Sequence, residues 1–227
     1  MPTQSLSLNE LVMLLALDDE EGKLRWSVSP FLDYALAGAM LAELTLRESV
    51  VVAGEGDLKL RSIDAPTGSL LLDDVLASFR ASDHPHTVTG WISATSAIKE
   101  LDHRQMEELM AKGILAKREG HFLFIFPSTT YPAKDKSPER EIIHRIRSIV
   151  LAHADFDTRM AILITIAHGA HLLRGIFSDE ELDAAQSRLA EIAQGRAIAG
   201  AAVELIQQAE RALYVASSIP FMGISRF

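Results

Sequence analysis

The sequence predicts a mainly α-helical fold, with a buried helical core wrapped by amphipathic helices and two short β-hairpins. Apolar residues recur at helical spacing in most segments of the 227-residue chain. Two segments, 31–46 and 157–177, are apolar on nearly every face, which is typical of central helices. Glycine-containing turns separate two pairs of short strand-like stretches. The length suits one large domain, and we expect a single domain over residues 1–227.

The first two helices carry clear start and stop signals. Ser7 and Glu10 have the spacing of a capping box, and the helix that they open ends at Gly22. Pro30 occupies the first position of the next helix, which continues to Leu46. We expect this second helix at the centre of the fold, because it lacks a polar face. Its expected buried side chains are Phe31, Leu32, Leu36, Met40, Leu41 and Leu44, packed by Ile162, Leu163 and Ile166.

The remaining elements follow from turn signals and helical periodicity. One hairpin is predicted over residues 50–61, and a second over Ile114–Phe126 with its turn at Glu119-Gly120. A second capping box, from Ser178 to Glu181, begins an Ala-rich remainder that we expect to form two helices as far as Ser217. Other helices are predicted over residues 69–81, 96–111, 137–153 and 157–177.

Composition limits the function classes. The net charge of −9 and the pI near 5.4 argue against broad nucleic-acid binding and against unaided attraction to anionic membranes. The absence of cysteine excludes disulfides and thiolate metal sites. No signal peptide is evident, and the apolar runs are far shorter than the roughly 20 residues that span a bilayer. We therefore expect a cytoplasmic protein that is at most peripheral on the cytoplasmic face of a membrane.

No motif indicates catalysis. Phosphate loops, dinucleotide fingerprints, nucleophile elbows and zinc-protease helices are absent from the sequence, so we expect no enzyme, no catalytic residues and no cofactor. His168 and His171 have a spacing that suits a metal, but no cysteine or nearby carboxylate accompanies them, so hydrogen-bonded histidines are favoured and no metal site is predicted. Arg140, His144 and Arg147 form a basic stripe, either a solvated face or an anion-binding face.

Five stretches, taken together, resemble the Golgi phosphoprotein 3 family. The most informative begins with Asp64-Ala65-Pro66-Thr67-Gly68 and continues through a leucine run to Asp73. The resemblance extends in register over nearly the whole chain and implies the fold expected above. The other four stretches are Leu6–Gly22, Gly38–Leu44, Lys112-Gly113-Ile114-Leu115 and Ile166-Ala167-His168.

The resemblance implies an adaptor that binds phosphatidylinositol 4-phosphate and protein partners. The family's headgroup site uses a Trp, an Arg near the start of the buried helix and two basic residues on a later helix. Trp26 matches the Trp when a two-residue deletion is allowed, and Lys99 matches one basic residue. Ala37 and Asp102 occupy the other two positions, so one donor is lost and one charge is reversed. The resemblance thus implies a partly lost headgroup site.

Two neighbouring arginines could compensate for the lost charges. Arg25 precedes Trp26, and Arg104 lies two residues beyond Asp102. Trp26 itself is equally compatible with a headgroup interface and with the core. We expect a shallow depression near Trp26, Lys99 and Asp102 that binds phosphatidylinositol 4-phosphate weakly or not at all, because Asp102 repels phosphate.

The apolar arm of the second hairpin predicts a contact surface. Phe122 and Phe124 belong to a run too apolar to be left in water, and relatives use this hairpin for self-association and membrane contact. The alternative is a winged-helix-like DNA-binding regulator, because a helix followed by a hairpin has the right local shape. Acidic residues on that helix (Glu100, Asp102, Glu107 and Glu108) oppose it, and no nucleic-acid partner is expected. The sequence leaves the physiological ligand and the oligomeric state open.

Overall fold

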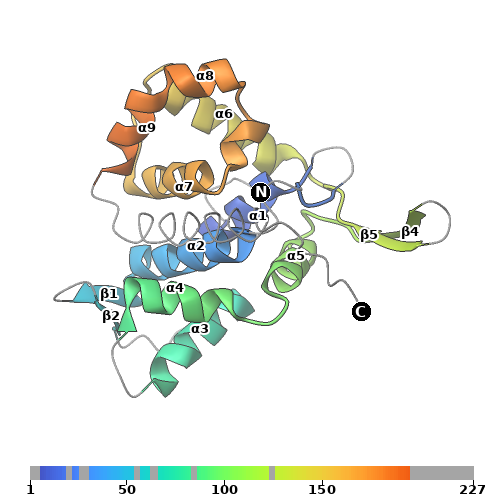
Figure 1. The fold of residues 1–227 in the computed structure, drawn as a ribbon. Helices are drawn as coiled ribbons and strands as arrows, with labels where there is room; N and C mark the ends of the chain where they lie inside the picture. The colour runs from blue at the N-terminus through green and yellow to red at the C-terminus, as the bar shows by residue number, and fades with distance from the viewer. Residues whose placement is uncertain are drawn as a thin grey trace, which may run out of the picture.

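A computed structural model describes residues 6–18, 22–25, 31–53, 57–61, 66–82, 86–122 and 126–194. The fold is mainly α-helical with two small antiparallel sheets, as predicted. Three helices form its centre: α1 (Leu8–Ala16), α2 (Leu32–Leu46) and α7 (Thr158–Gly169) contact one another. In Figure 1, α6, α8 and α9 gather on one side of this centre, and α3, α4 and the β1–β2 pair lie on the other.

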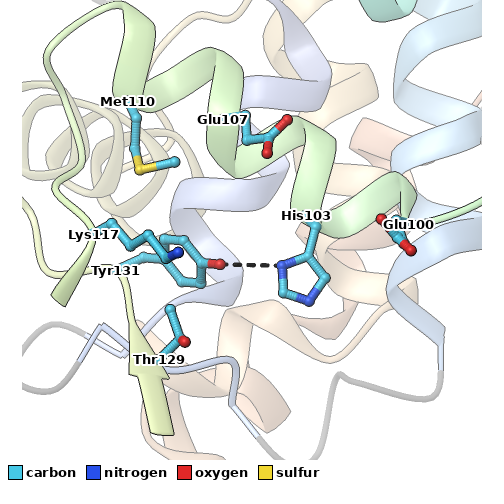
Figure 2. A pocket seen from close by; sticks show the side chains of 7 residues that line it. All are labelled: Glu100, His103, Glu107, Met110, Lys117, Thr129 and Tyr131. Carbon is cyan, nitrogen blue, oxygen red and sulfur yellow. Dashed lines mark hydrogen bonds between the residues drawn. The ribbon is translucent and has the colours of Figure 1, made fainter. Parts of the chain in front are cut away.

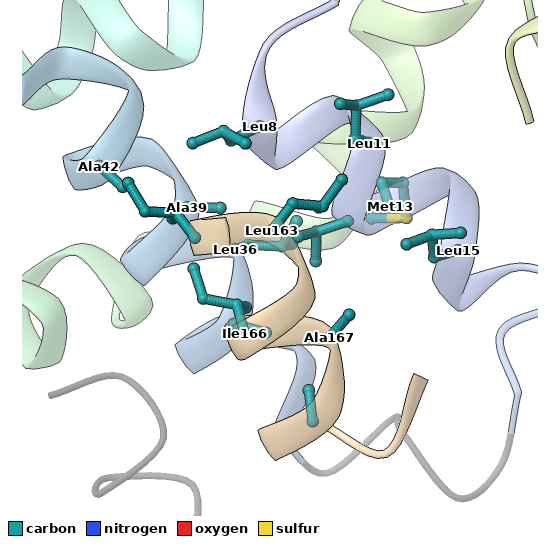
Figure 3. Close-up of a cluster of buried hydrophobic side chains, with 14 of the residues drawn as sticks. Leu8, Leu11, Met13, Leu15, Leu36, Ala39, Ala42, Leu163, Ile166 and Ala167 are labelled. Atoms are coloured by element: carbon teal, nitrogen blue, oxygen red, sulfur yellow. The ribbon is translucent and has the colours of Figure 1, made fainter. Parts of the chain in front are cut away.

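Helix α2 is the buried helix that the sequence predicts. Every side chain from Ala35 to Leu44 is buried, and so are Phe31 and Leu32. Ile162, Leu163 and Ile166 of α7 are buried as well, and α7 contacts α2 directly. Figure 3 shows the resulting cluster, with leucines of α1 facing Leu36, Ala39 and Ala42 of α2. Small side chains on α2 let neighbouring helices approach it on several sides.

The first hairpin is confirmed and is extended by a third strand. Strand β1 (Val50–Ala53) pairs with β2 (Asp57–Leu60), and β2 pairs in turn with β3 (His86–Thr87). Helix α3 (Leu70–Ala81) follows β2 as predicted, and Ser69 caps it by accepting the amide of Leu72. The sheet thus begins at the end of α2 and lies beside α3 and α4.

The turn of the second hairpin is not where the sequence analysis placed it. Strand β4 (Arg118–Phe122) pairs with β5 (Phe126–Thr130), so Glu119 and Gly120 lie inside the strand opposite Thr129 and Ser128. The chain reverses between Phe122 and Phe126 instead. Ile114 and Leu115 are buried before the hairpin, where Leu115 bridges to Ala133. The two strands project from the helical body (Figure 1), and the sequence that links them is apolar.

The helix predicted over residues 96–111 is confirmed only from Leu101 onward, and the helix before it was not predicted. The structure has α4 (Val88–Ser96) and α5 (Leu101–Ala111), separated by a turn in which Glu100 takes a left-handed conformation with φ 55°. Ile92 on α4 and Leu101 on α5 are both buried. The chain must change direction between them to bury both, and this tertiary requirement overrides the helical preference of the linking residues.

The later helices follow the predicted order. Helix α6 (Ser137–Leu151) buries Ile142, Ile146 and Val150, and α7 ends at Gly169 rather than near Phe177, where a 3₁₀ turn, η3 (Leu172–Gly175), follows. The predicted capping box at Ser178 opens α8 (Asp179–Ala184), and α9 (Gln186–Ala193) comes next. The rest of the predicted Ala-rich helical region, from residue 195 onward, lies outside the described residues.

Several residues in the stretches that resemble the Golgi phosphoprotein 3 family link α1 to α5 through buried polar contacts. The fully buried carboxylate of Glu10 accepts the amide of Ser7 at 2.8 Å and pairs with the Nζ of Lys112, 2.6 Å away. The Asn9 amide donates to Gln105 of α5 at 2.6 Å, and both side chains are buried. These stretches therefore hold α1 against α5, which is a structural role.

A second buried carboxylate joins three segments. Glu43 of α2 accepts the Leu8 amide at 3.0 Å, the Arg47 Nε at 2.7 Å and the Nη1 of Arg159, 2.8 Å away on α7. Its side chain is only 4% exposed, so the charge depends on these partners rather than on water. Arg159 also donates to the Leu6 carbonyl. Glu43 thus fixes the start of α1 against α2 and α7.

Candidate functional site

The headgroup positions implied by the resemblance do not assemble a basic site in the described residues. Ala37 is completely buried inside α2, so an arginine there would point into the core. The Lys99 side chain is 90% exposed and its Nζ lies 3.4 Å from Glu100. Trp26 lies outside the described residues. Of the matched positions, only Lys99 therefore offers a cation, and it extends into solvent.

Two carboxylates stand in the first turns of α2 and α5, two helices that contact each other. Asp33, in the first turn of α2, has an exposed side chain whose pKa is raised by partial desolvation and then by the charge of Asp102. Asp102 itself stands in the first turn of α5 and accepts the amide of His103 at 2.7 Å. Asp33 was not among the predicted site residues. This region is therefore acidic, which is unfavourable for phosphate.

Both arginines that could compensate already have other contacts. The Nε of Arg25 donates to the Leu17 carbonyl at 3.1 Å, and its guanidinium packs on Gly175, where a Cβ would lie 2.7 Å from Nη1. Arg104 forms an ion pair with Asp74 of α3. Neither guanidinium therefore points at Asp102 as an available phosphate ligand, and the compensation left open by the sequence would require breaking these contacts.

A pocket of about 440 Å³ lies beside this acidic region, between α5 and the base of the hairpin. One wall consists of one face of α5, where His103, Glu107 and Met110 recur at helical spacing, together with Glu100 just before the helix. Lys117, Thr129 and Tyr131 form the other wall (Figure 2). The acidic residues of this wall are evident in the sequence, but the two walls meet only in the tertiary structure.

The pocket has a fixed hydrogen bond at its centre. The Tyr131 hydroxyl lies 3.1 Å from the Nδ1 of His103, and burial is the main cause of a raised pKa for the Tyr131 phenol (Figure 2). Lys117 pairs with Glu119 at 2.7 Å, and this contact raises the pKa of the Lys117 ammonium. Lys117 thus stays charged, but Glu119 neutralises it.

The predicted hairpin contact residues are placed only in part. Phe122 closes β4 opposite Phe126, but its side chain lies outside the described part of the structure, and so does the whole of Phe124. On the basic stripe of α6, Arg147 is bound to Glu181 at 2.6 Å and lies over the Phe177 ring, so that member of the stripe has a structural role. Neither a cluster that could hold a metal nor a helix long and apolar enough to cross a membrane occurs among the described residues.

The described residues form a helical protein with a projecting hairpin. They do not form a basic site for an anionic ligand at the matched positions. A family model, described as Golgi phosphoprotein 3 (GPP34), matches residues 8–209. The chain therefore belongs to the Golgi phosphoprotein 3 family, and it is a protein of that adaptor kind. The match runs through α5 and the hairpin, so it accounts for the helix and hairpin that motivated the winged-helix alternative.

Proposed function

We propose that this chain is a non-enzymatic adaptor that works on the cytoplasmic face of a membrane without phosphatidylinositol 4-phosphate as its anchor. The carrying observation is the lack of a basic cluster at the matched positions that the structure describes: Ala37 is buried, Lys99 extends into solvent, and Asp102 adds a negative charge. Each charge-assisted hydrogen bond to phosphate contributes about 1.5–3 kcal/mol, so two missing ligands correspond to a hundredfold or greater loss of affinity. The family fold supports the adaptor role.

We propose further that the hairpin makes the membrane or self-association contact. The sequence that links β4 to β5, Phe122-Leu123-Phe124-Ile125-Phe126, is apolar, and both strands project from the helical body (Figure 1). Such a run attaches to a lipid surface through apolar burial, which does not depend on headgroup charge. The acidic net charge of the chain is compatible with this mode of contact.

Liposome flotation tests this proposal. We expect equal recovery on phosphatidylcholine–phosphatidylserine vesicles with and without phosphatidylinositol 4-phosphate, and loss of recovery or of self-association for Phe122→Asp plus Phe124→Asp. Light scattering measures the mass of both proteins. Leu151→Asp, which alters an exposed leucine at the end of α6, is the control and should leave both readouts unchanged. Recovery that requires phosphatidylinositol 4-phosphate, or a double variant that behaves like the parent, would contradict the proposal.

A gel shift at low salt separates the adaptor role from the winged-helix alternative. Duplex binding requires cations that face phosphate, whereas α5 presents Glu100, Asp102 and Glu107. We therefore expect no retarded duplex at protein concentrations at which a basic DNA-binding domain shifts it completely. Robust retardation would support the alternative.

A further inference from the structure

The pocket between α5 and the hairpin differs in its chemistry from a phosphate site. Its titratable lining contains two carboxylates, Glu100 and Glu107, against one ammonium, that of Lys117. Glu119 already neutralises Lys117 at 2.7 Å. Glu107 is exposed and forms no salt bridge with the described residues, and the partner of Glu100 is the solvent-exposed Lys99 at 3.4 Å. The pocket therefore has an excess of negative charge.

The neutral part of the lining adds hydrogen-bond acceptors and an apolar surface. The hydroxyl oxygens of Tyr131 and Thr129 and the carboxylate of Glu107 line the same space (Figure 2). The Nδ1 of His103 lies within hydrogen-bond distance of the Tyr131 hydroxyl. The phenol is protonated at neutral pH because phenols titrate at about pH 10, and burial raises the pKa of Tyr131 further. The Met110 thioether and the Tyr131 ring supply contact for an aliphatic chain. A ligand with an ammonium head and a short methylene stem matches this arrangement.

We infer that this pocket binds a small organic amine, with its primary ammonium group bound by Glu107 and its aliphatic stem against Met110 and Tyr131. The volume of about 440 Å³ lies in the range typical of small-molecule sites. A primary ammonium is favoured over a quaternary one because it carries three donors for the carboxylate and hydroxyl oxygens. A quaternary group would require several aromatic faces, and the lining contains one tyrosine. This inference does not depend on the adaptor proposal.

Isothermal titration calorimetry with putrescine, on the full chain without lipid, tests the inference. We expect one putrescine per chain, with binding that weakens as salt rises and is about tenfold weaker for Glu107→Gln, because a charge-assisted contact is lost. Tetramethylammonium should bind more weakly than putrescine, and inorganic phosphate should give no binding heat. The matched control is Glu180→Gln, which removes an exposed carboxylate on α8 and should not change the affinity.

The substitution Lys117→Gln tests whether the pocket favours a positively or a negatively charged ligand. Removal of this ammonium frees Glu119 and should tighten putrescine binding, whereas it would weaken binding at a phosphate site. Phosphate binding that Lys117→Gln abolishes, or putrescine binding that Glu107→Gln leaves unchanged, would overturn the inference. Both substituted side chains are exposed, so circular dichroism should show an intact fold in each variant.

Discussion

Replacement of Glu43 by Gln should lower the free energy of unfolding by about 3 kcal/mol, because it leaves two guanidiniums without their buried counter-charge. The Glu43 carboxylate is 4% exposed and is shared by Arg47 and Arg159, while it also accepts the amide of Leu8. A Gln side chain keeps the shape but replaces one acceptor oxygen with a donor that faces cations. Urea unfolding followed by circular dichroism measures the loss.

The matched control for this substitution is Glu48→Gln. Glu48 pairs with Arg61 at 2.7 Å, but both side chains are more than half exposed, at 71% and 59%. Water solvates either charge when the partner is lost, so we expect a change below about 1 kcal/mol. Equal effects at the two positions would show that Glu43 does not join α1, α2 and α7 in the way described here.

Replacement of Gly22 by Ala should lower the free energy of unfolding about as much as Glu43→Gln does, by about 3 kcal/mol. Gly22 has φ 64°, and a Cβ on it would lie 2.3 Å from the backbone nitrogen of Pro132. Its carbonyl accepts the amide of Tyr131 at 2.7 Å, so the residue docks directly on the segment after β5. A methyl group there must displace backbone, and this also shifts Tyr131 in the pocket. Urea unfolding measures the stability loss.

Gly68→Ala separates the clash from the backbone conformation. Gly68 has φ 83°, yet a Cβ there would meet no described atom within 4 Å. Its substitution therefore reports only the cost of a left-handed conformation, about 1 kcal/mol. If Gly22→Ala were no worse than Gly68→Ala, the close contact of Gly22 with Pro132 would not exist in solution.

Local sequence patterns predict the helical core well, because burial and periodicity are properties of single segments. The apolar character of residues 31–46 places α2 correctly, and the spacing of Ser178 and Glu181 predicts the start of α8. The misplaced hairpin turn and the misplaced start of α5 have the opposite origin. Gly120 resembles a turn residue but pairs with Ser128 within a strand, and Glu100 breaks a helix without any glycine or proline signal.

The candidate site depends on contacts between distant segments, which periodicity does not encode. The charge of Asp102 reaches Asp33 only because α2 and α5, whose first turns hold the two residues, pack against each other. The pocket likewise forms where one face of α5 meets Lys117 and Tyr131 near the hairpin base. Matching of single residues to a family predicts the loss of basic charge at positions 37 and 102, but it does not reveal that Ala37 is buried or that Arg104 is bound to Asp74.

The central claim is that the headgroup region of this chain repels phosphate through Asp102 and Asp33. A substitution that restores the charge should avoid Ala37, which is buried, and should act at the two acidic positions. Asp102→Arg plus Asp33→Asn changes the charge by three units at the headgroup region. Asp183→Arg plus Glu180→Gln makes the same change on exposed residues of α8 and controls for the effect of net charge.

Calorimetric titration with inositol 1,4-bisphosphate, the soluble headgroup of phosphatidylinositol 4-phosphate, compares these three proteins directly. We expect no measurable binding by the unmodified chain or by the α8 control. The headgroup-region variant should gain at least about tenfold in affinity, since it replaces repulsion with a charge-assisted contact. Micromolar binding by the unmodified chain, with no gain in the headgroup-region variant, would contradict the account.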